Sequence, residues 1–143
     1  MDPLKILKEE HRQLLSEVGE LERIVTGLTN RLSPTVQEEL KELLQRFIQL
    51  LSSHIEGEAS NFFPKLKARL PETDHWQVTM LETQYEMLLS EVQHLHELVS
   101  GVPSSIPVDR LKEGGAHLVR WLREHVMIEE ERLFQKLQGP PED

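Results

Sequence analysis

The sequence contains no cysteine among its 143 residues. This absence excludes disulfide bonds, thiolate-bound zinc, cysteine-ligated iron–sulfur clusters and any cysteine nucleophile. Any metal that the chain binds must therefore be held by nitrogen and oxygen donors. The sequence also lacks an apolar run long enough to cross a bilayer and a leader of charged and then apolar residues, so we expect a cytoplasmic protein.

The sequence also has few basic residues relative to acidic ones. The chain has 16 Lys and Arg against 25 Asp and Glu, which gives a net charge of −9. Such a chain repels the phosphates of nucleic acid and an anionic membrane surface, so we expect neither as a partner. Hydrophobic residues make up 38% of the chain and charged residues 29%, which is typical of one globular domain spanning residues 1–143.

The sequence has no stretch in which apolar and polar residues alternate with the period of a β-strand. Apolar residues recur instead every three or four positions along four long stretches. A proline stands at or near the start of each, where its missing N–H costs a helix no hydrogen bond. We therefore predict an all-α protein, an up-down-up-down four-helix bundle. The predicted helices are residues 3–28, 34–63, 72–100 and 107–138.

The four predicted helices form two similar hairpins. The segment LLSEV at residues 14–18 recurs at 88–92, and residues 51–66 resemble residues 122–137. An internal duplication of this kind predicts two helical hairpins related by a pseudo-two-fold axis. Equivalent residues of the two halves would then meet at the same place in the bundle.

Polar residues interrupt each apolar helix stripe at positions that should face the core. Burying such groups without a partner costs about 1–3 kcal/mol each. Because all four helices carry them, we expect one shared partner at the bundle axis. Each half contributes three of these residues, and they correspond across the duplication: His11 to Tyr85, His54 to His125, and Glu58 to Glu129.

The spacing of two His–Glu pairs indicates a metal centre. Histidine and glutamate four residues apart lie on one helix face and reach the same point, and the chain has this spacing in His54–Glu58 and in His125–Glu129. Imidazole, carboxylate and phenolate donors suit iron or manganese, and zinc stays an alternative. All six side chains together with a bridging oxide or hydroxide would fill most positions of two octahedral ions. The remaining positions would suit O₂, peroxide or NO.

The segments around these residues resemble a known family. They are LKEEHRQLL at 7–15, HIEGEASNFFPKL at 54–66, LETQYEMLL at 81–89 and HVMIEEERLF at 125–134. Over nearly the whole chain the sequence resembles the hemerythrin-like, HHE cation-binding family. The resemblance implies two non-haem irons between four helices and a role in binding or responding to O₂, peroxide, NO or iron supply. The ligands that it implies are His11, His54, Glu58, His125 and Glu129.

Tyr85 departs from the family pattern, which usually has a histidine on the third helix. A phenolate favours ferric iron, so this exchange favours sensing, detoxification or iron handling over bulk O₂ transport. Catalysis on peroxide or NO stays open. An alternative is an interaction module in which the metal site is degenerate. A core tyrosine whose hydroxyl bonds a neighbour is the alternative for Tyr85 itself.

Several residues near this constellation have two interpretations. Glu10, Glu56 and Glu130 are either solvated side chains or partners that orient a ligating histidine. Gly114 and Gly115 lie within the fourth predicted helix, where we expect them to permit close contact between helices or a kink.

Overall fold

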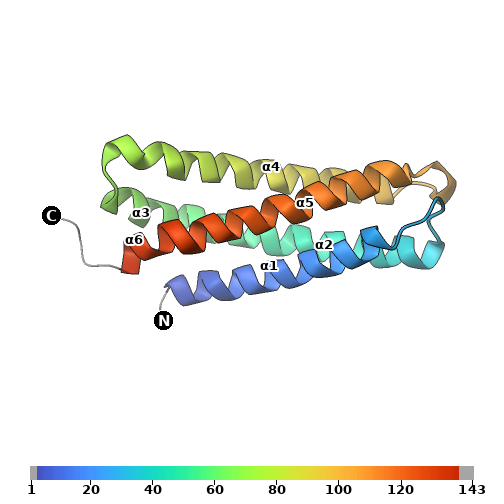
Figure 1. Cartoon of the computed structure of the whole chain (residues 1–143), viewed down its shortest axis with the longest axis horizontal. Coiled ribbons are helices and arrows are strands. Elements are labelled where there is room, and N and C mark those ends of the chain that lie inside the picture. Colours follow the sequence, from blue (N-terminus) through green and yellow to red (C-terminus); the bar gives the residue numbers. More distant parts are fainter. Residues whose placement is uncertain (1–2, 139–143) are drawn as a thin grey trace.

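The computed structural model describes residues 3–138, and these form a bundle of four long helical segments that run up and down in turn (Figure 1). The segments are α1 (Pro3–Thr26), α2 (Pro34–Gly57), α4 (His75–Val99) and α5 (Val108–Ile128). Short helices extend two of them at the end of the bundle where the chain termini lie: α3 (Phe63–Arg69) continues α2, and α6 (Phe134–Gln138) continues α5. The predicted all-α four-helix bundle is confirmed.

Each long helix packs against two others, so that α1 contacts α2 and α5, while α4 contacts α2 and α5. This arrangement places the hairpin of α1 and α2 against the hairpin of α4 and α5. Apolar side chains at helical spacing fill the interior, with Leu51, Leu88 and Leu122 fully buried. Burying each such side chain contributes about 1.5–3 kcal/mol, which makes the apolar stripes the main cause of the fold.

The second predicted helix continues beyond its expected end. We predicted an end at residue 63, but the backbone passes through the π-helical turn η1 (Glu58–Phe62) and stays helical to Arg69. The wider turn ends with the Phe63 N–H bonded to the Glu58 carbonyl, five residues back. Pro64 then lies in the first turn of α3, where its missing N–H leaves no bond unmade. The predicted end at residue 63 was wrong because the π turn lets the helix continue through Pro64.

The predicted starts at residues 3 and 34 and the predicted end at residue 138 agree with the structure, and apart from the end at residue 63 the other bounds differ by at most three residues. Helix α1 ends at Thr26, and α4 begins at His75 after the 3₁₀ turn η2 (Glu72–Asp74). A second 3₁₀ turn, η3 (Pro103–Ser105), connects α4 to α5. Helix α5 passes through a second π-helical turn, η4 (Glu129–Leu133), before α6.

Two glycines bring α5 close to its neighbours. A β-carbon on Gly114 would lie 2.7 Å from Cδ2 of Leu95 in α4, and one on Gly115 would lie 2.8 Å from Cγ1 of Val25 in α1. Both distances are too short for a real side chain, so the expectation of close helix contact is confirmed. Within residues 3–138, no helix is both long enough and apolar enough to cross a bilayer.

Candidate metal centre

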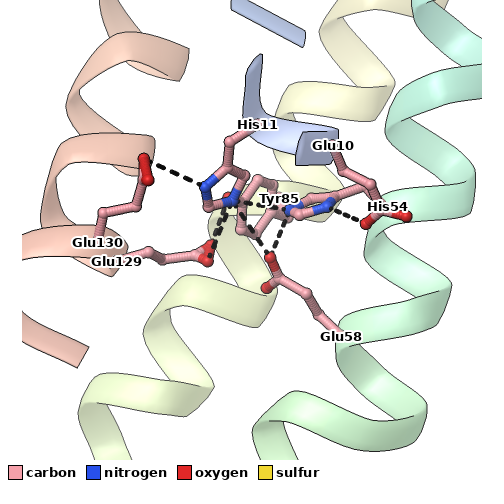
Figure 2. Close-up of polar contacts among 7 residues, drawn as sticks. All are labelled: Glu10, His11, His54, Glu58, Tyr85, Glu129 and Glu130. Carbon is pink, nitrogen blue, oxygen red and sulfur yellow. Dashed lines mark hydrogen bonds and ion pairs between the residues drawn. The ribbon is translucent and has the colours of Figure 1, made fainter. Parts of the chain in front are cut away.

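The polar residues that interrupt the apolar stripes meet in the interior of the bundle. Each is at most 2% exposed: His11, His54, Glu58, Tyr85, His125 and Glu129. Their side chains come from α1, from α2 with η1, from α4, and from α5 with η4. Figure 2 shows the side chains of His11, His54, Glu58, Tyr85 and Glu129 converging on one place between the helices.

Four of these residues form a compact group around His11. Its Nε2 atom lies 3.1 Å from Nε2 of His54, 3.7 Å from Oε1 of Glu58 and 3.7 Å from Oε2 of Glu129. Nε2 of His54 also contacts Oε1 of Glu58 (Figure 2). One donor atom from each of the four residues lies within 4.8 Å of the others. Two imidazole nitrogens and two carboxylate oxygens at this separation could hold a metal ion.

Tyr85 and His125 lie beside this group. The Tyr85 hydroxyl donates a hydrogen bond to Oε1 of Glu129. The Tyr85 ring centroid is 5.1 Å from that of His125 and 5.5 Å from that of His54. His125 does not belong to the compact group of four. All six predicted residues are therefore neighbours, while direct metal bonds from each of them stay predictions.

Many polar atoms of the centre are buried without a hydrogen-bond partner among the described residues. They are Nδ1 of His11, Oε2 of Glu58, both ring nitrogens of His125 and Oε2 of Glu129. An unsatisfied buried polar group costs about 1–3 kcal/mol, which is a large penalty to repeat at one place. A bound cation would remove much of it, because oxygen and nitrogen lone pairs can bind the cation. The residues present therefore fit a metal.

The two glutamates have opposite shifts in pKa. Burial opposes the ionisation of Glu58, but His11 and His54 outweigh it and lower its pKa to about 2. Burial and the negative charge of Glu58 raise the pKa of Glu129 well above its usual range. Two carboxylates this close resist joint ionisation, and a cation between them would favour the ionised form of both.

The two histidines of the His–Glu pairs also differ. Burial would lower the pKa of His54, but its contacts with Glu10 and Glu58 raise it to about 9. Burial lowers the pKa of His125 to about 4. Burial and then the charges of Glu129 and Glu58 raise the pKa of Tyr85 well above its usual range. Without a metal its hydroxyl therefore keeps its proton and donates a hydrogen bond to Glu129.

The three glutamates near the centre have separate roles. Oε1 of Glu10 lies 2.8 Å from Nδ1 of His54, at hydrogen-bond distance, and Oε2 of Glu130 lies 3.5 Å from Nδ1 of His11 (Figure 2). Glu56 is exposed to solvent. The interpretation of Glu10 as the partner of a buried histidine therefore agrees with the structure, and Glu56 is a solvated side chain.

Both His–Glu pairs are followed by a π-helical turn that the sequence did not predict. Turn η1 begins at Glu58 and turn η4 begins at Glu129, which are equivalent residues in the duplication. Single π turns inside α-helices occur frequently at functional sites. Pro64 could have indicated the first turn, because a proline needs a local change in hydrogen bonding. The second turn has no such proline, and only the duplication could have suggested it.

A helical bundle that buries histidines and glutamates around one point defines a class of metal-binding four-helix proteins. A family model for the hemerythrin HHE cation-binding domain matches residues 2–137, and the chain belongs to this family. The predicted family is confirmed. No curated protein and no solved structure matches the chain significantly.

Proposed function

We propose that the chain is a non-haem di-iron protein whose centre binds or responds to O₂, peroxide or NO. The proposal rests on the buried group of His11, His54, Glu58 and Glu129, in which Oε2 of Glu58 and Oε2 of Glu129 lack hydrogen-bond donors among the described residues. Membership of a cation-binding family supports it. Iron bound there would supply a change of oxidation state and open positions for a small ligand, and manganese or zinc are the other candidate ions.

The arrangement of donors supports two ions with a bridging oxide or hydroxide. His11 and His54 would hold one ion, because their Nε2 atoms are only 3.1 Å apart. Tyr85 and His125 would hold the second, since their rings are neighbours and both nitrogens of His125 are free of hydrogen bonds to described residues. Glu58 and Glu129 lie between the two sets and would bridge the ions.

Aromatic rings close the centre against water. The Phe134 ring stacks on the His11 ring at a centroid distance of 5.5 Å, and the Phe62 ring packs on Phe134 at 5.0 Å. Both phenylalanines are at most 3% exposed. A small uncharged molecule suits such a site better than a large or charged substrate. This supports a diatomic or peroxide ligand, and Tyr85 supports sensing, detoxification or iron handling over bulk transport.

The test is the iron content and visible spectrum of protein produced in iron-supplied cells. We expect about two irons per chain and an absorption band from phenolate bound to Fe(III). Replacement of Tyr85 by Phe should bleach the band while the iron content shows whether the ions remain. Metal-free or single-zinc protein would contradict the proposal. An unchanged spectrum in an iron-loaded Tyr85→Phe variant would remove Tyr85 alone from the ligands.

The second candidate function is an interaction module with a degenerate site. The hydrogen bond from Tyr85 to Glu129 favours it, because this bond pairs two buried polar groups without a metal. This candidate predicts that added iron leaves the unfolding temperature unchanged. The cytoplasmic location, the single domain over residues 1–143 and the absence of nucleic-acid and membrane partners stay predictions from the sequence.

A further inference from the structure

The three buried histidines differ in what contacts the ring nitrogen Nδ1. Nδ1 of His54 lies 2.8 Å from Oε1 of Glu10, at hydrogen-bond distance. Nδ1 of His11 is 3.5 Å from Oε2 of Glu130 but makes no hydrogen bond to a described residue. Neither nitrogen of His125 has such a bond. Only His54 therefore has a carboxylate hydrogen-bonded to its ring within residues 3–138.

The contact with Glu10 determines which ring nitrogen of His54 is available to the metal centre. Nδ1 points to Glu10 on α1, while Nε2 points to Glu58 and to Nε2 of His11 (Figure 2). A carboxylate that accepts a hydrogen bond from Nδ1–H fixes the ring orientation and leaves the Nε2 lone pair for a metal. It also makes that nitrogen a stronger donor.

The duplication shows that this carboxylate exists in one half only. The alignment that pairs His11 with Tyr85 pairs Glu10 with Gln84. At the position where the first half has a carboxylate, the second half has an amide without charge. The two equivalent histidines thus differ: His54 has a carboxylate partner on its Nδ1 atom, and His125 has none among the described residues.

We propose that Glu10 is a positioning residue that makes the two ion positions unequal, so that the ion beside His54 is held more tightly than the ion beside His125. The inference rests on the proposed di-iron function and deepens it. Glu10 contacts Nδ1 of His54, so it acts through the ring of that residue. Losing such a partner typically lowers metal affinity about 10–100-fold.

The experiment is a titration of the iron-loaded protein with a competing chelator, following iron released per chain. Wild-type protein should release one iron at least about tenfold more readily than the other, the lower limit for the loss of such a partner. Glu10→Gln should weaken the tightly held iron about 10–100-fold and leave the other unchanged. Glu9→Gln is the matched control, because Glu9 lies on the same helix, is 55% exposed and pairs with Arg12. It should behave as wild type.

Gln84→Glu is the converse variant and should tighten the weakly held iron. Two irons of equal affinity in the wild type, or equal loss of both irons or of neither in Glu10→Gln, would overturn this inference alone. A wild-type chain that binds no iron would overturn the proposed function and this inference with it. Urea unfolding of the metal-free variants checks that each folds. Glu10 is 30% exposed, so the amide fits without strain.

Discussion

The two helical hairpins share a sequence pattern but build unlike halves of the centre. Glu58 and Glu129 occupy equivalent positions, and each opens a π-helical turn. His11 and His54 nevertheless hold the pKa of Glu58 at about 2, whereas burial beside Glu58 raises that of Glu129. Duplication therefore determines where a group lies, while its immediate neighbours determine its charge.

The largest expected difference between the halves concerns these glutamates in metal-free protein. At pH 7 Glu58 is ionised and contacts His54, so Glu58→Gln breaks a buried ion pair and should cost about 3–5 kcal/mol. Burial and the charge of Glu58 raise the pKa of Glu129 and so favour its neutral form, which the amide of Glu129→Gln resembles. We expect that change to cost about 1 kcal/mol, the worth of one rearranged hydrogen bond.

Urea unfolding in the presence of a chelator measures both costs. Glu131→Gln is the control for the change in net charge, because Glu131 lies on the same π-helical turn as Glu129 and is exposed. Equal costs for Glu58→Gln and Glu129→Gln would show that the two halves have the same electrostatics, which would contradict the comparison.

The equivalent histidines should respond to pH in opposite directions. The pKa of His54 rises from 6.5 to about 9 on folding, so its contribution to stability is full below pH 6.5 and is lost as the pH rises to 9. The pKa of His125 falls from 6.5 to about 4, so stability is lost as the pH falls from 6.5 to 4. Each loss amounts to at most about 3 kcal/mol.

The measurement is the NMR titration of the histidine ring protons in metal-free protein. Variants His54→Gln and His125→Gln assign the two signals, and urea unfolding across the same pH range gives the stability. His54→Gln should remove the loss above pH 6.5, and His125→Gln should remove the loss below it. Both histidines titrating near 6.5 would mean that their surroundings are equivalent.

The sequence predicted the bundle and the meeting of its polar residues for a definite physical reason. Apolar residues at helical spacing determine which face of each helix is buried, and His11, His54 and Glu58 share that face with leucines. Burial of that face then forces the polar groups together. The internal duplication added the equivalent residues of the second half, including Tyr85.

The remaining features depend on distances that spacing does not determine. The sequence left Glu10 open between solvent and the ring of His54, because a side chain at the edge of a helix face can reach either. The end of the second helix and the π turns after α2 and α5 were also not predictable in detail. Pro64 indicated the end of a helix, but through the π turn η1 the chain stays helical beyond this proline. The pKa shifts follow from burial and contacts that exist only after folding.

The two hairpins also differ in how they pack in the core. Extending the alignment of residues 51–66 with 122–137 towards the N-terminus places Leu43 and Leu44 opposite Gly114 and Gly115. Both leucines are at most 2% exposed and fill the core of the first half. The second half reaches the same core with α5 drawn close to α1 and α4. Packing of the two hairpins is therefore asymmetric, and its cost can be measured.

Replacing Gly115 by Ala should give the smallest of the three differences. Its β-carbon would lie 2.8 Å from Cγ1 of Val25, a branched side chain that cannot rotate away, and overpacking of this kind costs about 1–3 kcal/mol. Alanine gains about 1 kcal/mol over glycine within a helix, so we expect a net loss of about 1 kcal/mol in urea unfolding. In Gly114→Ala the one short contact is with the end of the flexible Leu95 side chain, so this variant should be nearly neutral. Gly19→Ala is the control, because a β-carbon there meets nothing within 4 Å, and the higher helix propensity of alanine should stabilise the protein. A loss of stability in Gly19→Ala would show that the Gly115→Ala result does not report contact with Val25.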